Sequence, residues 1–488
     1  MVVNGSTTNV LAPEQSSSLR VVQQATPLPA EQLPPYTPIA ETLHQQLPYA
    51  ATSHVEGEQV GDDCSEDQPP AFEQLLAIDN LGSSSTDTVY GYSPSFDTFQ
   101  CVEAASTMTF TFEGVRGVHV SVRTDDADRY GGQVCIQSRR CGPKSVVNGD
   151  EVPLPSISSD STEHSAILVK FAQCPGYFGQ KTGGGIGSEY EIVVPTRERR
   201  IQQLNLRLSE NSHLDMRQCA GTEELCIDVA VVEGSVVLRQ TPAIRGMRVS
   251  IGSGTIEAQD FRCLGDAQFV AMQGRIHLER AASVGLLLKT TLATVAVTDS
   301  CAHSINVKTQ TAPVSLHRTN ATDTIDVSSV SGAVSLDDIS TCFLTVATDT
   351  ASVSGVWAVS EQLRIFAGLA AVHGRLQHVD NGQAMLALGG CECIIRTRGK
   401  PVHLQVDENF SGTFDLRARG SVVRFDPAAQ NPPYTSFTQY FLTWMQGTVF
   451  PHPHPAAVAP FAHCAQYRLF VENENAPVIV TTTAAAAA

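Results

Sequence analysis

The sequence predicts an all-β protein: a single-stranded parallel β-solenoid, β-helix-like, of about ten coils, preceded by a disordered N-terminal arm. Three observations support this prediction. A repeat of 19–20 residues runs through the middle of the chain, apolar residues alternate within each repeat, and a tiny residue stands at a fixed place in each. A fixed period in this range is typical of stacked units that each carry short strands.

The repeat is defined by apolar positions that recur in register. One unit begins at each of Ile227, Met247, Ala267, Leu286, Ile305, Ile325, Leu344 and Leu363. Seven places on, the residue is always Gly or Ala: Gly234, Gly254, Gly274, Ala293, Ala312, Gly332, Ala351 and Ala370. We expect a tight bend there, where a larger side chain would clash or oppose a positive φ.

Each coil should carry two short strands whose alternate residues point inward. Positions zero, two and four of the repeat form one inward row, and positions seven, nine and eleven form the other. Position four becomes hydroxylic in four successive coils, and the stacked hydroxyls are expected to bond to one another as a ladder: Thr290, Thr309, Ser329 and Thr348. So small a coil is filled by its own side chains, which leaves function to the outer faces.

Composition divides the chain into four parts. Residues 1–100 are rich in Pro, Ser and acids and are predicted to be a disordered arm; residues 101–203 are a β-rich entry or cap region. Residues 204–426 hold the solenoid repeats, and residues 427–488 are a C-terminal cap segment with a low-complexity tail. Within that segment, Phe437 to Phe450 is expected to form a short apolar helix or strand that closes the end of the stack.

The charge is negative and uneven. The net charge is −18, and residues 1–100 contain thirteen acids and a single base, Arg20. No basic stripe is visible, which argues against nucleic-acid partners. No apolar run is long enough to span a bilayer and no signal peptide is evident, so a cytoplasmic location is the default expectation and the cell surface the alternative. The thirteen cysteines lack a disulfide spacing framework, and Cys263, Cys301 and Cys342 are expected to be buried thiols.

Three groups of residues contain side chains that can carry chemistry, and no catalytic, cofactor or metal site is predicted from any of them. The glycine-rich stretch from Lys181 to Ser188 has its lysine before the glycines, the wrong order for a phosphate loop. The group His452, His454, His463 and Cys464 lies in a proline-rich stretch that favours a solvated linker over a metal site. A row of alternating charges is expected to pair along the stack rather than to catalyse: Asp260, Arg280, Asp299, Arg318 and Asp338, with Asp337 alongside.

Two short motifs are candidate partner sites. Leu33, Pro34, Pro35 and Tyr36 fit the Leu-Pro-x-Tyr pattern that WW-type domains bind in polyproline conformation. Asn431, Pro432 and Tyr434 fit the Asn-Pro-x-Tyr turn that adaptor domains of the phosphotyrosine-binding type recognise. Both patterns are short enough to arise by chance, and carbohydrate binding is left open.

The repeat also resembles a known family. Units such as IDVSSVSGAVSLDDIS and MRVSIGSGTIEAQDF are similar to those of the putative-adhesin family, bacterial and fungal β-solenoid domains of unknown function. The resemblance covers about Leu204 to Phe425, and the acidic arm with its proline motif is similar to that of fungal members. It implies a fold and carries over no catalytic residue. Membrane-anchored members usually carry an apolar helix, which this sequence lacks.

Three functions remain open from the sequence. The first is a non-enzymatic scaffold that binds proteins through its outer face and its Pro-rich arm. The second is an adhesin-like surface or cell-wall protein. The third is a carbohydrate-active β-helix enzyme, which would need converging carboxylates on one outer face.

Overall fold

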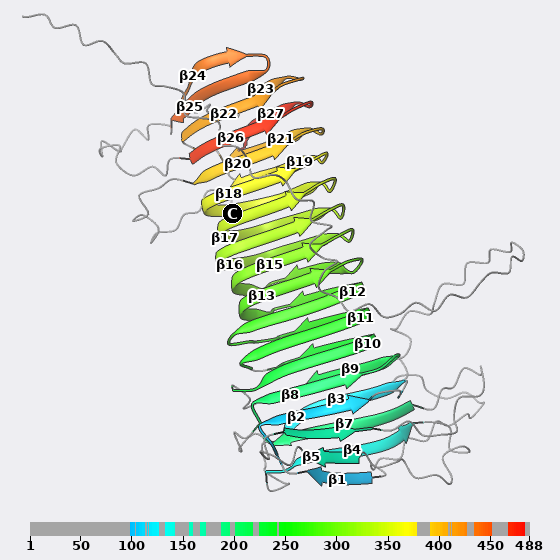
Figure 1. The fold of residues 1–488 in the computed structure, drawn as a ribbon. Helices are drawn as coiled ribbons and strands as arrows, with labels where there is room; N and C mark the ends of the chain where they lie inside the picture. Colours follow the sequence, from blue (N-terminus) through cyan, green and yellow to red (C-terminus); the bar gives the residue numbers. More distant parts are fainter. Residues whose placement is uncertain are drawn as a thin grey trace, which may run out of the picture. The chain divides into compact units, whose positions relative to one another are not determined.

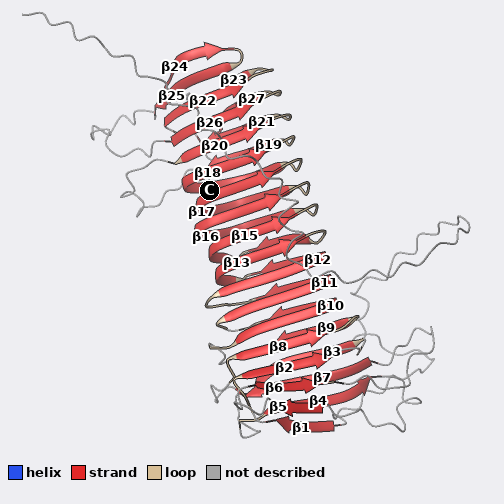
Figure 2. Ribbon diagram, in the orientation of Figure 1, coloured by secondary structure: helices blue, strands red, loops and turns tan. Residues whose placement is uncertain are grey.

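A computed structural model describes the chain between residues 98 and 483. Its longer gaps are residues 126–131, 142–155, 160–165, 172–186, 196–200, 218–223, 378–390, 427–433 and 451–466, and its shorter ones are 103, 113–114, 116, 242–243, 408–409 and 411. All regular structure in the described ranges is β-strand (Figure 2), which confirms the all-β class. These ranges contain no helix with the length and apolarity that a membrane crossing requires.

The repeats form strands that stack in parallel, each on the strand one repeat earlier. Ile227 pairs with Met247, and Met247 pairs with Ala267, in the register that the repeat predicts. Val314 pairs with Val334 in the same way. The strands of this region are β10 (Cys226–Arg239), β11 (Gly246–Gln259), β12 (Asp266–Glu279), β13 (Ala282–Thr290), β14 (Thr294–Thr298), β15 (Cys301–Thr309), β16 (Val314–Ser329), β17 (Val334–Thr348), β18 (Val353–Ala367) and β19 (Val372–Gln377).

The tiny residue at position seven marks a bend, as predicted. Gly234, Gly254 and Gly274 have positive φ angles of 143°, 130° and 109°. A Cβ on Gly254 would lie 1.8 Å from the backbone oxygen of Gly234, so only glycine fits. In these three coils the strand continues through the bend. In the later coils, where this position is mostly alanine, the backbone turns and the two halves are separate strands.

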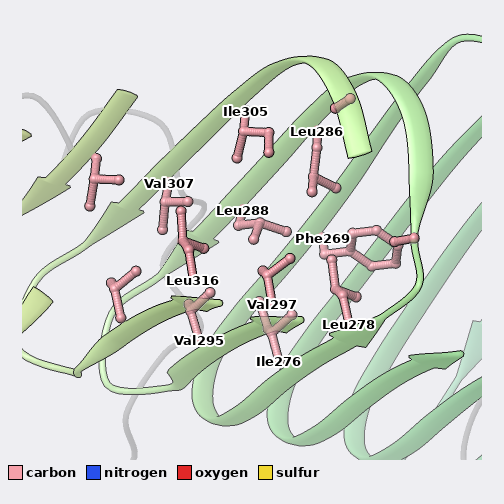
Figure 3. Close-up of a cluster of buried hydrophobic side chains, with 14 of the residues drawn as sticks. Phe269, Ile276, Leu278, Leu286, Leu288, Val295, Val297, Ile305, Val307 and Leu316 are labelled. Atoms are coloured by element: carbon pink, nitrogen blue, oxygen red, sulfur yellow. The ribbon is translucent and has the colours of Figure 1, made fainter. Parts of the chain in front are cut away.

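The core lies between the two halves of each coil. Figure 3 shows Phe269, Leu286 and Leu288 facing Ile276 and Val297 across the interior. Apart from several glycines, residues of the inward rows are buried, whereas most of their neighbours along each strand are half-buried or exposed. The alternation predicted from the repeat is therefore confirmed. Burial of these apolar rows is the main stabilising contribution, at about 25 cal/mol per Å² removed from water.

The hydroxyl row does not form the predicted ladder between coils. The hydroxyls of Thr309, Ser329 and Thr348 donate to the carbonyls three residues further along the same coil, at 3.3, 2.7 and 2.9 Å. The prediction of bonds between coils is wrong, because each bend places a carbonyl oxygen of the same coil within hydrogen-bond reach of the hydroxyl. The buried hydroxyl of Thr290 has no hydrogen-bond partner.

At the N-terminal end the coils do not follow the order of the sequence. Here β2 pairs with both β6 and β8, and β3 pairs with both β7 and β9, so the coil of β2 and β3 lies between two later ones. The strands of this end are β1 (Thr98–Val102), β2 (Thr107–Phe112), β3 (Val118–Asp125), β4 (Val134–Cys141), β5 (Ser156–Ser159), β6 (Ala166–Lys170), β7 (Gly187–Pro195), β8 (Gln203–Leu208) and β9 (Ser212–Arg217). The antiparallel strands β1, β4 and β5 flank them.

The C-terminal end is also out of sequence order. Strand β26 pairs with β20 and β22, and β27 pairs with β21 and β23, so the last strands of the chain lie inside the stack (Figure 1). The strands are β20 (Glu392–Thr397), β21 (Val402–Asp407), β22 (Gly412–Ala418), β23 (Val423–Asp426), β24 (Tyr434–Phe441), β25 (Trp444–Phe450), β26 (Tyr467–Asn473) and β27 (Val478–Thr483). The hairpin of β24 and β25 pairs with β22, so the apolar segment forms strands rather than a helix.

The three cysteines expected to be buried differ from one another. Cys263 is buried, and burial raises the pKa of its thiol. Cys342 is half-buried and Cys301 is exposed, so the prediction is wrong for these two. Both lie between the inward rows, where the repeat pattern does not determine which way a side chain faces.

Candidate functional site

The described residues bring two histidines and an aspartate together near the N-terminal end of the stack. The cluster consists of His119 on β3 with His213 and Asp215 on β9. One side-chain nitrogen of each histidine and one carboxylate oxygen of the aspartate all lie within 4.8 Å of one another. The two imidazole rings are tilted against each other, with centroids 4.8 Å apart. These residue types are the usual ligands of transition metals.

Strand register accounts for this arrangement. His119 pairs with His213, and Ser121 pairs with Asp215, in the parallel ladder of β3 and β9. On β9 the side chains of Leu214 and Met216 fill the core and are fully buried. His213 and Asp215 alternate with them and so lie together on the outer side of the sheet.

Two neighbouring strands complete the surroundings of the histidines. Nδ1 of His213 lies 2.5 Å from the hydroxyl oxygen of Ser235 on β10. Nδ1 of His119 lies 3.7 Å from Oε1 of Glu189 on β7. Each ring therefore has a polar group from the adjacent coil beside its Nδ1 atom.

Asp215 is buried, and only one of its two carboxylate oxygens accepts a hydrogen bond from the described residues. The residue is 6% exposed, and its Oδ2 accepts a hydrogen bond from Nε of Arg217 at 2.6 Å. Its other oxygen, Oδ1, is buried without a hydrogen-bond partner. The hydrogen bond between Arg217 and Oδ2 of Asp215 raises the pKa of Arg217. A buried carboxylate oxygen without a donor costs free energy and calls for a ligand or water.

The environment keeps His213 neutral. Burial, followed by the proximity of His119, lowers the pKa of His213 from 6.5 to about 4, and the charge of Asp215 opposes this only in part. Desolvation disfavours the charged imidazolium, which explains the direction. At neutral pH the imidazole of His213 therefore has a lone pair on one nitrogen.

The alternating charge row forms ion pairs, as expected. Nε of Arg280 lies 2.6 Å from Oδ1 of Asp260, and Nε of Arg318 lies 2.6 Å from Oδ1 of Asp299. Asp338 continues the row, and all five members have a left-handed backbone, with φ between 46° and 57°. The charges thus lie at a repeated corner of the coils. Exposed pairs of this kind contribute about 0–1 kcal/mol each.

The predicted partner motifs fall mostly outside the described residues. Leu33, Pro34, Pro35 and Tyr36 lie there, as do Asn431 and Pro432. Tyr434 is the first residue of β24 and pairs with Phe450. The histidine group at 452–464 and most of the glycine-rich stretch before β7 also lie outside them.

Sequence reasoning missed the histidine cluster. His119 and His213 are separated by more than ninety residues, and the first lies in the region without a regular repeat. A His-x-Asp pair on a predicted strand was the available signal. It gains significance only when β3 is known to pair with β9.

A shallow hollow lies on the outer side of the first regular coils. It measures about 90 Å³ and is lined by residues of β10, β11 and β12, among them Arg239, Glu257, His277 and Glu279. Sites for small molecules usually measure about 300–1,000 Å³. The hollow is therefore too small to enclose a typical organic ligand.

The comparisons with known proteins are sparse. No protein-family profile matches the sequence, and no curated protein matches it. A solved structure described as a "putative cell adhesion protein" from Clostridium sporogenes ATCC 15579 is 7% identical and aligns over 79% of this chain and 98% of its own, with a TM-score of 0.16. At that score the likeness supports neither a shared fold nor a shared function. The resemblance to adhesins thus stays a prediction.

Proposed function

We propose that this chain is a non-enzymatic β-solenoid scaffold that binds other proteins through its outer surface and its Pro-rich arm. The turn of the β24–β25 hairpin supports the proposal most directly. Tyr440, Phe441 and Leu442 are 69%, 60% and 76% exposed there, and Phe437 is exposed nearby. Adjacent exposed apolar side chains are typical of surfaces that contact another protein.

One edge of the hairpin is also open to a partner. Among the described strands, β24 pairs with β25 alone, so its outer edge has backbone groups available to a partner. Open edges of this kind accept an added strand from another protein. The occupant we propose is an extended segment of a partner protein, with apolar side chains that cover Tyr440 and Phe441.

The stacked strands form a regular support for such contacts. The long strands β10, β11 and β12 pair in register along both halves of the coil, and their inward side chains fill the interior. Proteins built from stacked repeats use their extended outer surfaces for binding.

The test compares partners of the full chain with those of two variants. One variant carries Tyr440→Ser, Phe441→Ser and Leu442→Ser; the other carries Tyr36→Ala in the arm. We expect the first to lose the partner that binds the hairpin and the second to lose WW-type domains in a titration with purified domains. Tyr90→Ala, a tyrosine change outside both motifs, is the matched control.

Two outcomes would contradict the proposal. If both variants keep every partner of the unchanged protein, neither surface is used. If instead the purified full chain binds cell-wall glycans and the hairpin variant binds them equally well, the adhesin-like alternative is the better explanation.

A further inference from the structure

The cluster of His119, His213 and Asp215 has no role in the scaffold function described above. We infer that it binds one divalent transition-metal ion, with Zn²⁺ as the first candidate, through one nitrogen of each imidazole and one oxygen of Asp215. Two histidines and a carboxylate provide three ligands, and water completes the coordination.

The separations between the side chains fit a metal site. The candidate ligand atoms all lie within 4.8 Å of one another. Two atoms bound to the same tetrahedral Zn²⁺ ion are about 3.4 Å apart, since each bond is about 2.1 Å long. Binding of an ion therefore requires the candidate ligand atoms to approach one another by rotation of their side chains.

Asp215 provides an independent observation that points to a ligand. Its side chain is buried, and Oδ1 has no hydrogen-bond partner. Oδ2 is held by Arg217, so the carboxylate is fixed in orientation while Oδ1 stays available. The side chain of Arg217 is 61% exposed, so its charge is partly solvated.

The groups behind the histidines match the usual surroundings of metal ligands. A ligating imidazole commonly donates its other N–H to a carboxylate or another oxygen. Ser235 occupies this position at Nδ1 of His213, and Glu189 lies beside Nδ1 of His119. Nε2 of His213 is thus the nitrogen that would bind the ion.

The site would join two parts of the stack. His119 belongs to the coil that is out of sequence order, and His213 and Asp215 belong to the coil that follows it in space. An ion bound to all three links these coils. Because a ligand that binds only the folded state stabilises that state, Zn²⁺ should raise the melting temperature.

The experiment uses the full chain without a histidine tag, first stripped with EDTA. Zn²⁺ is titrated by calorimetry, and bound metal is counted after equilibrium dialysis. We expect His119→Gln and His213→Gln each to weaken binding at least about tenfold and to abolish the rise in melting temperature. His317→Gln on β16, which is exposed and far along the chain, should bind as the unchanged protein does.

Other histidines must be separated from the cluster. The rings of His373 and His403 are stacked, with their centroids 5.0 Å apart, and could bind an ion on their own. A double variant, His373→Gln with His403→Gln, tests this. If that variant loses the binding while His213→Gln keeps it, the inference is wrong, and absence of Zn²⁺ binding by the unchanged protein overturns it equally.

A second measurement avoids variants that fail to fold. In the unchanged protein, Zn²⁺ should protect His119 and His213 from modification by diethyl pyrocarbonate, as read by peptide mass spectrometry, while His317 stays reactive. Equal modification of His119 and His213 with and without Zn²⁺ would overturn the inference.

Discussion

The indole of Trp357 occupies the space that a side chain on Gly374 would fill. A Cβ atom on Gly374 would lie 2.1 Å from Cη2 of the indole, and one on Gly355 would lie 2.8 Å from its Nε1. In the parallel register these two glycines stand in one row of paired residues between Leu336 and Leu404. The row therefore has no side chain at two successive positions, and the side chain of Trp357 lies there. The fully buried indole takes up this volume.

Replacement of Gly374 by alanine should therefore destabilise the fold. The added methyl has no room unless Trp357 moves, and overpacking of this kind typically costs about 1–3 kcal/mol. The free energy of unfolding, measured by urea titration, should fall by that amount. Gly246→Ala is the control, because its Cβ would meet the Cys226 sulfur at an ordinary 3.5 Å. Equal stability of the two variants would mean that Trp357 is not confined by Gly374.

Val327 and Ser328 test the inward and outward assignment directly. Val327 is 2% exposed, whereas Ser328 is half-buried on the outer side of β16. Val327→Asp puts an unpaired charge into the core, which costs several kcal/mol and should abolish folding. Ser328→Asp should leave the circular dichroism spectrum and the melting temperature nearly unchanged. Similar damage from both substitutions would contradict the assignment.

Thr348 and Thr290 occupy the same place in different coils but differ in hydrogen bonding. The Thr348 hydroxyl donates to the carbonyl of Ala351 at 2.9 Å, whereas the Thr290 hydroxyl has no partner. Valine has nearly the same shape as threonine, so Thr348→Val loses a hydrogen bond and should destabilise by about 1–2 kcal/mol. Thr290→Val removes an unsatisfied buried group and should be neutral or stabilising. Urea unfolding of the two variants should give changes of opposite sign or clearly different size.

The repeat could be predicted from the sequence because its information is local. Alternation along a strand and a fixed period place Val229, Val249 and Phe269 in one inward row without knowledge of the rest of the chain. The bend at position seven follows from the same pattern. The pattern does not specify hydrogen-bond partners: the Ser329 hydroxyl donates to the carbonyl of Gly332, not to a hydroxyl of the next coil.

The ends of the stack could not be predicted, since there the order in space departs from the order in sequence. The coil of β2 and β3 lies between later coils, and β26 lies between β20 and β22. Pairing between segments that are remote in sequence leaves no periodic signal in the sequence. The histidine cluster lies at such a junction, which is why neither His119 nor His213 stood out.

Cys101 and Cys135 lie opposite each other on the antiparallel strands β1 and β4, with their sulfur atoms 2.8 Å apart. Two thiols this close on paired strands can form a disulfide without backbone movement. We therefore expect diamide, a thiol oxidant that accepts the two electrons and two protons, to link them. Peptide mapping under non-reducing conditions should show the Cys101–Cys135 crosslink, and Cys135→Ser should abolish it.

Cys391 and Cys393 are a second pair of neighbouring thiols, and we expect them to be oxidised less readily than Cys101 and Cys135. Their sulfur atoms are 3.6 Å apart, yet both residues are buried and only two positions apart in the chain. A hydrogen bond with Cys391, together with burial, raises the pKa of Cys393 well above its usual value, so little thiolate forms at neutral pH. Cys101 is partly exposed and should react first. If diamide links Cys391 to Cys393 and leaves Cys101 reduced, proximity across β1 and β4 does not control thiol oxidation in this protein.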